Sequence, residues 1–308
     1  MKFALITDNS RDESYVCRNG EFFRFDYTNM SKKYRLLGFW QLPALFNGTF
    51  INLKYNAVPD EEYDIIFAAI EKDSNNLDTI KKLYPDARIF GCFKEIWNQN
   101  IDVRNYVIDN TEGFISPYTN IDIFDKFGLN RPIYDIRIPQ PIDIDYLQTK
   151  FNCKKENKIF LYSNTWAQGR SSNWSEKFLQ SLPYEYKTAQ SVDDPYRHTE
   201  TWKECKFMIN LDPTTNYGIQ SLQCAALGTI MIGSNNDCQK ELFPDLVGTD
   251  ESYLLDKLSQ LINDKKYYET TLKYANNLLY SKYSMDVVKT KIEKITLRDS
   301  KDSKGVWI

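Results

Sequence analysis

Short apolar runs alternate along the chain with stretches of helical periodicity, and this alternation constrains the fold more than any other feature. Runs of four to eight apolar residues between polar segments are typical of buried strands, and their alternation with helices is typical of parallel sheets. The sequence therefore predicts an α/β protein with doubly wound, Rossmann-like parallel sheets. The predicted strands cover residues 2–7, 49–55, 63–70, 87–93 and 104–109, and then 158–163, 184–190, 206–212 and 229–234.

Apolar residues at a spacing of three and four predict helices between these strands. Asn173, with Glu176 three residues later, fits a capping box at the start of one of them. The clearest periodicity lies near the C-terminus, where two amphipathic helices are expected. The predicted helices cover residues 33–46 with an interruption at Pro43, 78–85, 173–182, 219–227 and most of 250–283.

A chain of 308 residues is longer than one ordinary domain, and the segment "IPQPIDID" is a good boundary. Its two prolines, Pro139 and Pro141, stiffen an extended connector that a helix does not cross. We predict a Rossmann-like domain over residues 1–140, a second over 141–285, and a C-terminal helix with a frayed tail over 286–308. The two domains are expected to face each other across a cleft.

Several classes of protein do not fit the composition. No apolar run approaches the roughly 20 residues that cross a bilayer, and the N-terminus "MKFALITDNS" becomes polar too soon for a signal peptide. Six cysteines without a CxxC pair favour reduced thiols in a cytoplasmic protein over a disulfide framework or a zinc site. The single histidine, His198, lies in the polar stretch "DDPYRHTETW" and is expected in solvent. No metal site is predicted.

The charge is balanced, with a formal net charge of −3. Residues 1–140 hold 17 Lys and Arg against 20 Asp and Glu, so this half is slightly acidic. A nucleic-acid partner would therefore require a local basic patch rather than a basic domain.

The loop "SNTWAQGRSSNW", from Ser163, follows a predicted strand and precedes a helix. Ligands of open α/β sheets bind past the carboxyl ends of the strands, where helix-start amide groups favour anions. Ser163, Asn164 and Arg170 are therefore candidate ligands of a phosphate group, with Arg170 as a bidentate donor. The alternative is an ordinary turn with a solvated arginine.

A second loop and helix, "NYGIQSLQCAALG" from Asn216, follow another predicted strand. Asn216, Tyr217 and Gly218 stand before the helix and Gln223 lies within it, so these residues are candidates for reading a ligand. Gln190, at the end of the strand over residues 184–190, is a candidate for recognising a base. For Gln223 the alternative is a structural glutamine whose amide is satisfied by its neighbours.

Together these two loops and the "IPQP" link resemble the donor domain of glycosyltransferases with two Rossmann-like domains, the GT-B fold. The resemblance covers about residues 136–290. It implies a nucleotide-sugar donor such as a UDP-sugar, with no tightly bound cofactor and no required divalent metal. The glutamate that reads the ribose hydroxyls in that fold is replaced by Gln223, and an earlier glutamate of the retaining families is replaced by Thr215.

The first half is similar in its order of motifs to the T-even phage DNA β-glucosyltransferase. This similarity implies that Glu95, after the run "RIFGCF", is the catalytic base that takes the proton of the acceptor hydroxyl. Glu71 and Asp73, after the run "DIIFAAI", are alternatives of the same chemical kind. Each of the three is equally compatible with a surface carboxylate.

The leading hypothesis is a cytoplasmic glycosyltransferase, a hexosyl- or pentosyltransferase that uses a nucleotide sugar. Its acceptor would be a hydroxymethylated pyrimidine in phage DNA, and the enzyme would act in the host cytoplasm. The alternatives are a transferase for a surface glycan or a lipid-linked precursor, and a non-catalytic protein that binds sugar nucleotides. The sequence leaves open the anomeric outcome, inverting or retaining, and the oligomeric state.

Overall fold

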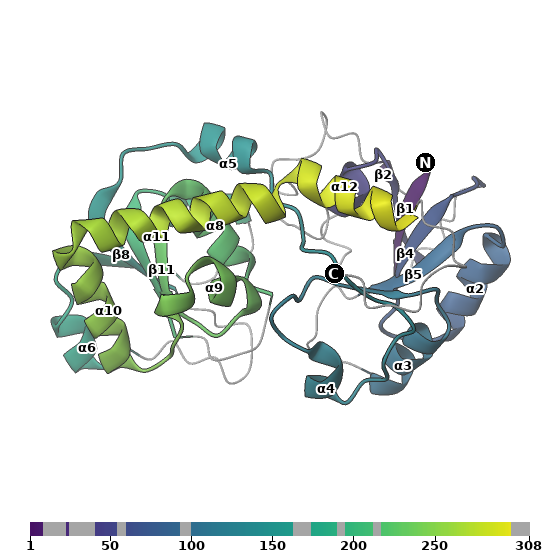
Figure 1. Cartoon of the computed structure of the whole chain (residues 1–308), viewed down its shortest axis with the longest axis horizontal. Coiled ribbons are helices and arrows are strands. Elements are labelled where there is room, and N and C mark those ends of the chain that lie inside the picture. The colour runs from purple at the N-terminus through teal and green to yellow at the C-terminus, as the bar shows by residue number, and fades with distance from the viewer. Residues whose placement is uncertain are drawn as a thin grey trace. The chain divides into compact units, whose positions relative to one another are not determined.

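The computed structural model describes residues 1–8, 23–24, 41–53, 60–92, 100–162, 174–189, 195–211 and 217–296. They form two compact units, each with its own sheet (Figure 1). The first unit comprises the described residues up to Pro141 together with those from Val288 onward, and the second runs from Ile142 to Val287. The predicted α/β class with parallel sheets is confirmed.

The sheet of the first unit has seven strands in the order β2-β3-β1-β4-β5-β6-β7. All neighbouring pairs are parallel except the edge pair of β2 and β3. Residues of β1 and β4 are fully buried along their whole length, as continuous apolar runs in a covered parallel sheet require. The strands are β1 Phe3–Thr7, β2 Phe23–Arg24, β3 Thr49–Asn52, β4 Ile65–Ala69, β5 Arg88–Cys92, β6 Phe114–Ser116 and β7 Asp135–Arg137.

Helices connect these strands and cover the sheet. In α2 the buried residues are Leu77 and Ile80, one helical turn apart, and Lys81 and Lys82 lie in the last turn, where they complement the helix dipole. In α4 the side chain of Asp122 caps the first turn and Gly128 ends the helix in a left-handed conformation. The helices of this unit are α1 Gln41–Ala44, α2 Asn75–Leu83, α3 Ile101–Asp109 and α4 Ile123–Phe127, and most of α12 Met285–Thr296 also groups with it.

The sheet of the second unit has four parallel strands in the order β11-β10-β8-β9. The centre of its core is formed by the buried residues of β8, β10 and β11. Residues Ile219–Leu227 form α8, within the limits predicted for this helix. The strands are β8 Glu156–Tyr162, β9 Glu185–Ala189, β10 Cys205–Asn210 and β11 Ile230–Gly233.

Helical segments complete the described part of the second unit. Leu254, Leu258 and Leu261 recur on one face of α10 and are buried, so the strong periodicity near the C-terminus is the signal of a core-facing helix. These segments are α5 Ile144–Phe151, α6 Glu176–Gln180, α7 Pro195–Trp202, α8, α9 Asp237–Leu242, α10 Glu251–Asn263 and α11 Lys265–Leu278, with a π-helical turn over Leu279–Tyr283, besides a short 3-10 turn over Pro244–Leu246.

Three expectations were wrong. Residues 104–109 are not a strand but the end of α3, which begins after the capping residue Asn100. The capping residue of α6 is Ser175 rather than Asn173, because the Ser175 hydroxyl accepts the N–H of Phe178 and Glu176 is the first residue of the helix. His198 is buried in α7 rather than solvated.

Among the helices in the described parts of the chain, none combines the length and the apolar character needed to cross a membrane.

Candidate functional site

Each sheet contains a point where the order of its strands reverses. In the first sheet β1 lies between β3 and β4, and in the second sheet β8 lies between β9 and β10. The loops that leave two such neighbouring strands run to opposite sides, which opens a crevice past their carboxyl ends where ligands of open α/β sheets bind. The candidate sites are therefore the carboxyl ends of β1 and β4 in one unit and of β8 and β10 in the other.

Asp8, directly after β1, organises the first of these positions. Its carboxylate accepts the backbone N–H groups of Glu71 (2.8 Å), Lys72 (3.0 Å) and Asp73 (3.1 Å), and the side-chain amide of Asn76 (3.0 Å). Asp8 is buried, and these four donors satisfy an ionised carboxylate that would otherwise be costly to bury. Asp8 thus fixes the loop that follows β4.

Arg104, from α3, reaches the same loop. Its Nη2 lies 3.0 Å from Oε1 of Glu71, with the Arg104 side chain 2% exposed and that of Glu71 12% exposed. Burial lowers the pKa of Arg104, and the neighbouring Glu71 carboxylate opposes that shift. Burial likewise raises the pKa of the Cys92 thiol at the end of β5, so this thiol stays protonated. The result is a buried ion pair at the carboxyl end of the sheet.

The two candidate bases in this loop differ in environment. Glu71 is held by Arg104, which stabilises its ionised form and occupies one carboxylate oxygen. Asp73 is exposed, and its carboxylate accepts the N–H of Asn75 at the start of α2. Glu95 lies outside the described residues. Glu71 therefore has a defined structural partner in Arg104. Which of Glu71, Asp73 and Glu95 acts as the base remains a prediction.

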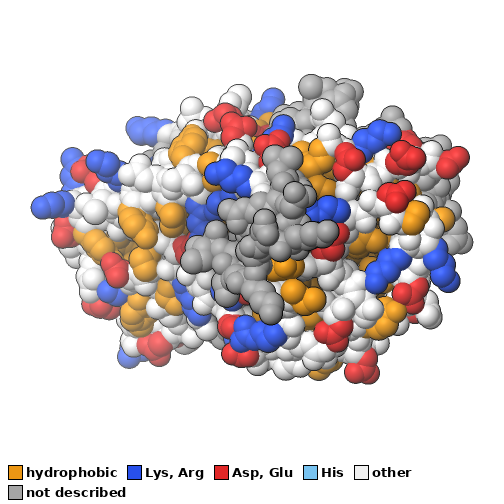
Figure 2. Space-filling view, turned by 45° about the vertical axis from the view of Figure 1, so that its right-hand side comes forward, with side chains coloured by type: hydrophobic (Ala, Val, Ile, Leu, Met, Phe, Trp, Pro, Cys, Tyr) orange, Lys and Arg blue, Asp and Glu red, His pale blue; other side chains and the backbone are white. Residues whose placement is uncertain are grey.

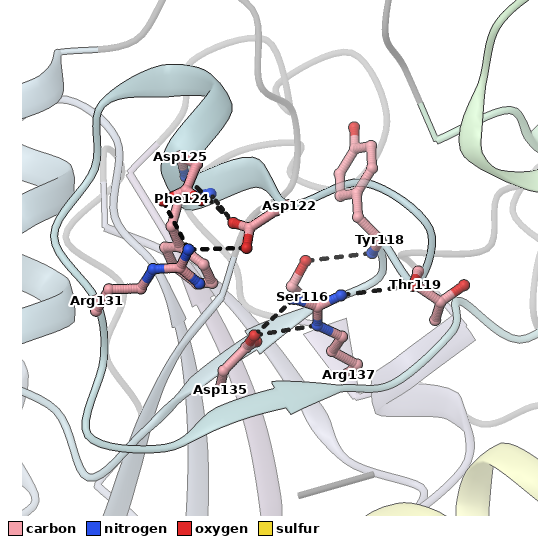
Figure 3. A network of polar contacts seen from close by, with 9 residues as sticks. All are labelled: Ser116, Tyr118, Thr119, Asp122, Phe124, Asp125, Arg131, Asp135 and Arg137. Carbon is pink, nitrogen blue, oxygen red and sulfur yellow. Dashed lines mark hydrogen bonds and ion pairs between the residues drawn. The ribbon is translucent and has the colours of Figure 1, made fainter. Parts of the chain in front are cut away.

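A second polar network lies at the carboxyl ends of β6 and β7 (Figure 3). Asp135 accepts both Nε and Nη2 of Arg137 at 3.0 Å, and Nη1 of Arg137 donates to the carbonyl oxygen of Thr119 at 3.4 Å. The hydroxyl of Ser116 accepts the N–H of Tyr118 at 3.2 Å. These contacts tie the loop after β6 to the edge strand β7.

In the second unit, the amino end of α8 lies near the end of β10. Gly218 is the capping residue of α8, has φ +91° and supplies no side chain to the first turn. A Cβ atom at Gly218 would lie 1.9 Å from Oδ1 of Asn236, so only glycine fits. The carbonyl oxygen of Tyr217 accepts the N–H of Cys238 at 3.0 Å, which joins this loop to α9.

Asn236 is the centre of a buried hydrogen-bond network and is 1% exposed. Its Oδ1 accepts the N–H of Gln239 (2.7 Å) and contacts Oγ of Ser221 (3.2 Å), while its Nδ2 donates to Oγ of Ser234 (2.7 Å). Nε2 of Gln239 donates to the carbonyl oxygen of Met231 at 2.8 Å. The amino ends of α8 and α9 and the end of β11 are thus held together.

The chain leaves β11 through two residues in the left-handed region. Gly233 has φ +97° and Ser234 has φ +64°. This conformation costs a residue with a side chain roughly 1–2 kcal/mol, so the surroundings must stabilise it at Ser234. They do so through two backbone bonds, from Ser234 N–H to Asn210 (2.7 Å) and from Gly248 N–H to Ser234 (3.2 Å). Such conformations concentrate at functional sites.

The predicted donor residues fall into two groups. Tyr217, Gly218 and Gln223 are described, and the structure places all three at α8 or directly before it. Gln223 is 3% exposed, and its contact with a ligand remains a prediction. Ser163, Asn164, Arg170, Gln190 and Asn216 lie outside the described residues, so their roles remain predictions.

Sequence reasoning missed Asp8, Arg104 and Asn236. Asp8 stands directly after the first apolar run, and that position is a usable signal for a residue at a strand end. Arg104 was read as part of a strand, which hid its position on a helix face. Asn236 follows "TIMIGS" by two residues and precedes a short helix, a pattern typical of a helix cap.

Three further features concern the part of the chain that the structure describes. No three His, Cys, Asp or Glu side chains there come together as a metal site requires. On the face drawn in Figure 2, basic and acidic side chains of the described residues are interspersed. The described cysteines are free thiols, namely Cys92, Cys153, Cys205, Cys224 and Cys238.

Comparison with known proteins identifies the fold. No protein-family model matches the chain, and no curated protein matches it in sequence. Among solved structures, HepE from Anabaena in complex with UDP has a TM-score of 0.60 at 10% identity, with 96% of this chain and 99% of HepE covered. An alpha-glucosyltransferase in complex with UDP-glucose and DNA containing an abasic site has a TM-score of 0.54 at 10% identity, with the same coverage.

TarM from S. aureus, solved with Fondaparinux, alpha-GlcNAc-glycerol and UDP, has a TM-score of 0.53 at 12% identity. Here 84% of this chain and 59% of TarM are covered. These proteins are GT-B glycosyltransferases, and this chain has their fold, as the resemblance in its sequence predicted.

Proposed function

We propose that this chain is a glycosyltransferase that moves a sugar from a UDP-sugar to a hydroxyl group of an acceptor. The observation that carries the proposal is the match of 96% of the chain to glycosyltransferases whose structures contain UDP or UDP-glucose. The reversal of strand order in both sheets supports it, because each reversal provides a place for one of two substrates.

The donor is assigned to the second unit. Residues 163–173 and 212–216, which lie outside the described residues, follow β8 and β10 in the sequence, the two strands at the reversal. Arg170 and the first-turn amide groups of α8 would stabilise the diphosphate, since both favour negative charge. Gly218, the capping residue, has no side chain that could compete with a ligand for the amide groups of that first turn. Ser163, Asn164, Gln190, Asn216 and Tyr217 complete the proposed site, with Gln223 as the proposed reader of the ribose.

The transfer forms one bond and breaks another. The acceptor oxygen attacks C1 of the sugar, the bond from C1 to the phosphate oxygen breaks, and UDP leaves with the electron pair. In an inverting reaction the proton of the acceptor hydroxyl passes to a carboxylate of the first unit. Glu95 is the proposed base, and Glu71 and Asp73 are the alternatives.

For the acceptor we propose a hydroxymethylated pyrimidine in DNA, as in a phage DNA-modification enzyme. The support is the alpha-glucosyltransferase that was solved with DNA and matches the chain over nearly its full length. A glycan is the second candidate, supported by the likeness to TarM, which was solved with an oligosaccharide. The interspersed charges of the described residues in Figure 2 favour neither acceptor.

The test is a screen of UDP-hexoses and UDP-pentoses by thermal shift, followed by an assay of UDP release. Hydroxymethyl-modified DNA, unmodified DNA and glycans would serve as acceptors. We expect at least one donor to raise the Tm and modified DNA to accelerate UDP release, with DNA retention that weakens as salt increases. Glu95→Gln, Glu71→Gln and Asp73→Asn then identify the base as the variant that still binds UDP but no longer transfers.

Each failure points to a different conclusion. If no nucleotide sugar raises the Tm or releases UDP, the glycosyltransferase proposal is wrong. If a donor binds tightly but no acceptor is modified, the chain is a non-catalytic sugar-nucleotide-binding protein. Transfer to glycans but not to modified DNA would replace the acceptor and keep the enzyme class.

A further inference from the structure

We propose that Asn236 is a positioning residue for the donor site, acting through Gly218 and Ser221 without touching the donor. This inference rests on the proposed function, because it takes the amino end of α8 to face the nucleotide sugar. It assigns a role to a side chain that the donor-site predictions did not include.

Asn236 packs directly against Gly218. The position of a Cβ at Gly218 is 1.9 Å from Oδ1 and 2.3 Å from Cγ of Asn236, so the carboxamide occupies the space that a side chain would take. The carboxamide therefore packs directly against Cα of Gly218. A displacement of either group moves the other, and Gly218 is the residue from which α8 begins.

The capping residue of α8 contributes no side chain to its first turn. It is Gly218, and a glycine has no side chain to bond the first-turn amide groups. Most helices are held there by Ser, Thr, Asp or Asn. In α8 the first turn is instead held through the side chain of Ser221. Its Oγ lies 3.2 Å from Oδ1 of Asn236 and 3.1 Å from Oε1 of Gln239. These contacts fix the first turn of α8, in which the N–H of Ser221 also donates to the carbonyl oxygen of Gly218 at 2.9 Å.

Two hydrogen bonds fix the orientation of the Asn236 side chain. Nδ2 donates to Ser234 and Oδ1 accepts from the backbone of Gln239, so rotating the amide by 180° would break both bonds. Ser234 in turn is bonded through its N–H to the carbonyl oxygen of Asn210, the last residue of β10. A continuous chain of short contacts therefore connects β10 and β11 to the amino end of α8.

This arrangement explains why a left-handed serine is tolerated at position 234. The conformation directs the Ser234 hydroxyl to Asn236, at 2.7 Å from Nδ2 and 3.3 Å from its backbone N. Strain that persists outside a glycine is expected where it holds functional groups in place. Here the groups held in place are backbone amides that, under the proposed function, bind the diphosphate of the donor.

Removing the carboxamide would leave a gap beside Gly218 and deprive Ser221 of one acceptor. The start of α8 could then shift, and ligand contacts that depend on it would lose their geometry. A misplacement of about 1 Å at an active site lowers the reaction rate by up to about a hundredfold. We therefore expect Asn236→Ala to raise the Kd for UDP about tenfold or more.

The experiment measures UDP binding by titration calorimetry and Tm in four proteins: the full chain, Asn236→Ala, Asn236→Asp and Asp264→Ala. Asp264 caps α11 in the same unit, where its carboxylate accepts the N–H of Tyr267 at 2.9 Å, so it controls for the loss of any helix cap. Asn236→Asp keeps both acceptor contacts of Oδ1, and the Ser234 hydroxyl can donate to the second oxygen.

We expect Asn236→Ala and Asp264→Ala to lower the Tm by similar amounts, but only Asn236→Ala to weaken UDP binding. Asn236→Asp should bind UDP within about threefold of the parent chain. Equal UDP affinity in Asn236→Ala and Asp264→Ala would overturn the inference while leaving the proposed function intact. If Asn236→Ala does not fold, the Asn236→Asp variant provides the test of the inference. Loss of UDP binding in a folded Asn236→Asp protein would contradict the inference. Absence of UDP binding by the parent chain would instead contradict the proposed function.

Discussion

At the scale of single residues, the only histidine of the chain shows how strongly surroundings decide chemistry. His198 is 9% exposed, and its ring lies edge-on to Phe160 (5.8 Å between centroids) and Tyr162 (5.7 Å). Burial lowers its pKa to about 4. The imidazole is therefore neutral at physiological pH and packs as an aromatic ring under the end of β8.

This burial predicts a pH dependence of stability. Unfolded His198 has a pKa near 6.5 and binds a proton between about pH 6.5 and 4, whereas the folded state does not. Stability should thus fall as the pH drops through this window, by at most about 3 kcal/mol. In His198→Phe that part of the loss should disappear, which urea denaturation at pH 7 and pH 4.5 would measure. An NMR titration of the single imidazole that gives a pKa near 6.5 would contradict the prediction.

Residue-level prediction from the sequence was strongest where a residue's role depends on its own backbone. The sequence places Gly218 directly before the helix predicted over residues 219–227, and Gly218 has the left-handed conformation at the start of α8. Asn236 was missed because its role depends on Gly218, Ser221 and Ser234, which come together only through the fold. A single sequence does not show which loops meet.

At the scale of elements, the ion pair of Arg104 and Glu71 links α3 to the loop after β4. Arg104→Leu would remove the guanidinium that the part-buried carboxylate of Glu71 contacts at 3.0 Å, which costs up to about 3–5 kcal/mol. Replacing both residues by leucine should cost clearly less than the sum of the two single changes, because neither charge is then left alone. Urea denaturation of the two single variants and the double variant measures this coupling. Additive losses would show that the pair contributes little.

The same helix explains the one strand that was predicted wrongly. The residues 104–109 contain a short apolar run that fits a strand or a helix equally well. The helix starts earlier, at Ile101, where Asn100 caps the N–H of Val103, and its buried residues include Val103 and Val107, one turn apart. A window that begins at residue 104 omits the cap and half of the buried face. Longer elements such as α10 gave unambiguous periodicity and were predicted correctly.

At the scale of the whole molecule, local sequence signals only partly reveal how the proposed donor and acceptor sites are distributed between the two units. Apolar runs located most strands, but the order of strands in a sheet is set by long-range pairing. That order brings Asp8 beside Glu71, 63 positions apart, and places β8 beside β10. The strand order is therefore needed to identify the carboxyl ends of β1 and β4, and of β8 and β10, as candidate sites. The sequence alone indicates only that segments after strands are candidates.

Hydrogen exchange with and without UDP tests this division directly. If the donor binds the second unit, saturating UDP should slow exchange at the first-turn amides of α8 and at the ends of β8 and β10. At a hundredfold excess over Kd the added stability is about 2.7 kcal/mol, enough to slow exchange about a hundredfold where opening releases the ligand. Gly218→Ala is the matched control: its Cβ would collide with Asn236, so UDP should no longer protect these amides. Protection confined to the first unit, around Asp8 and Glu71, would place the nucleotide on the other sheet and reverse the assignment of the two sites.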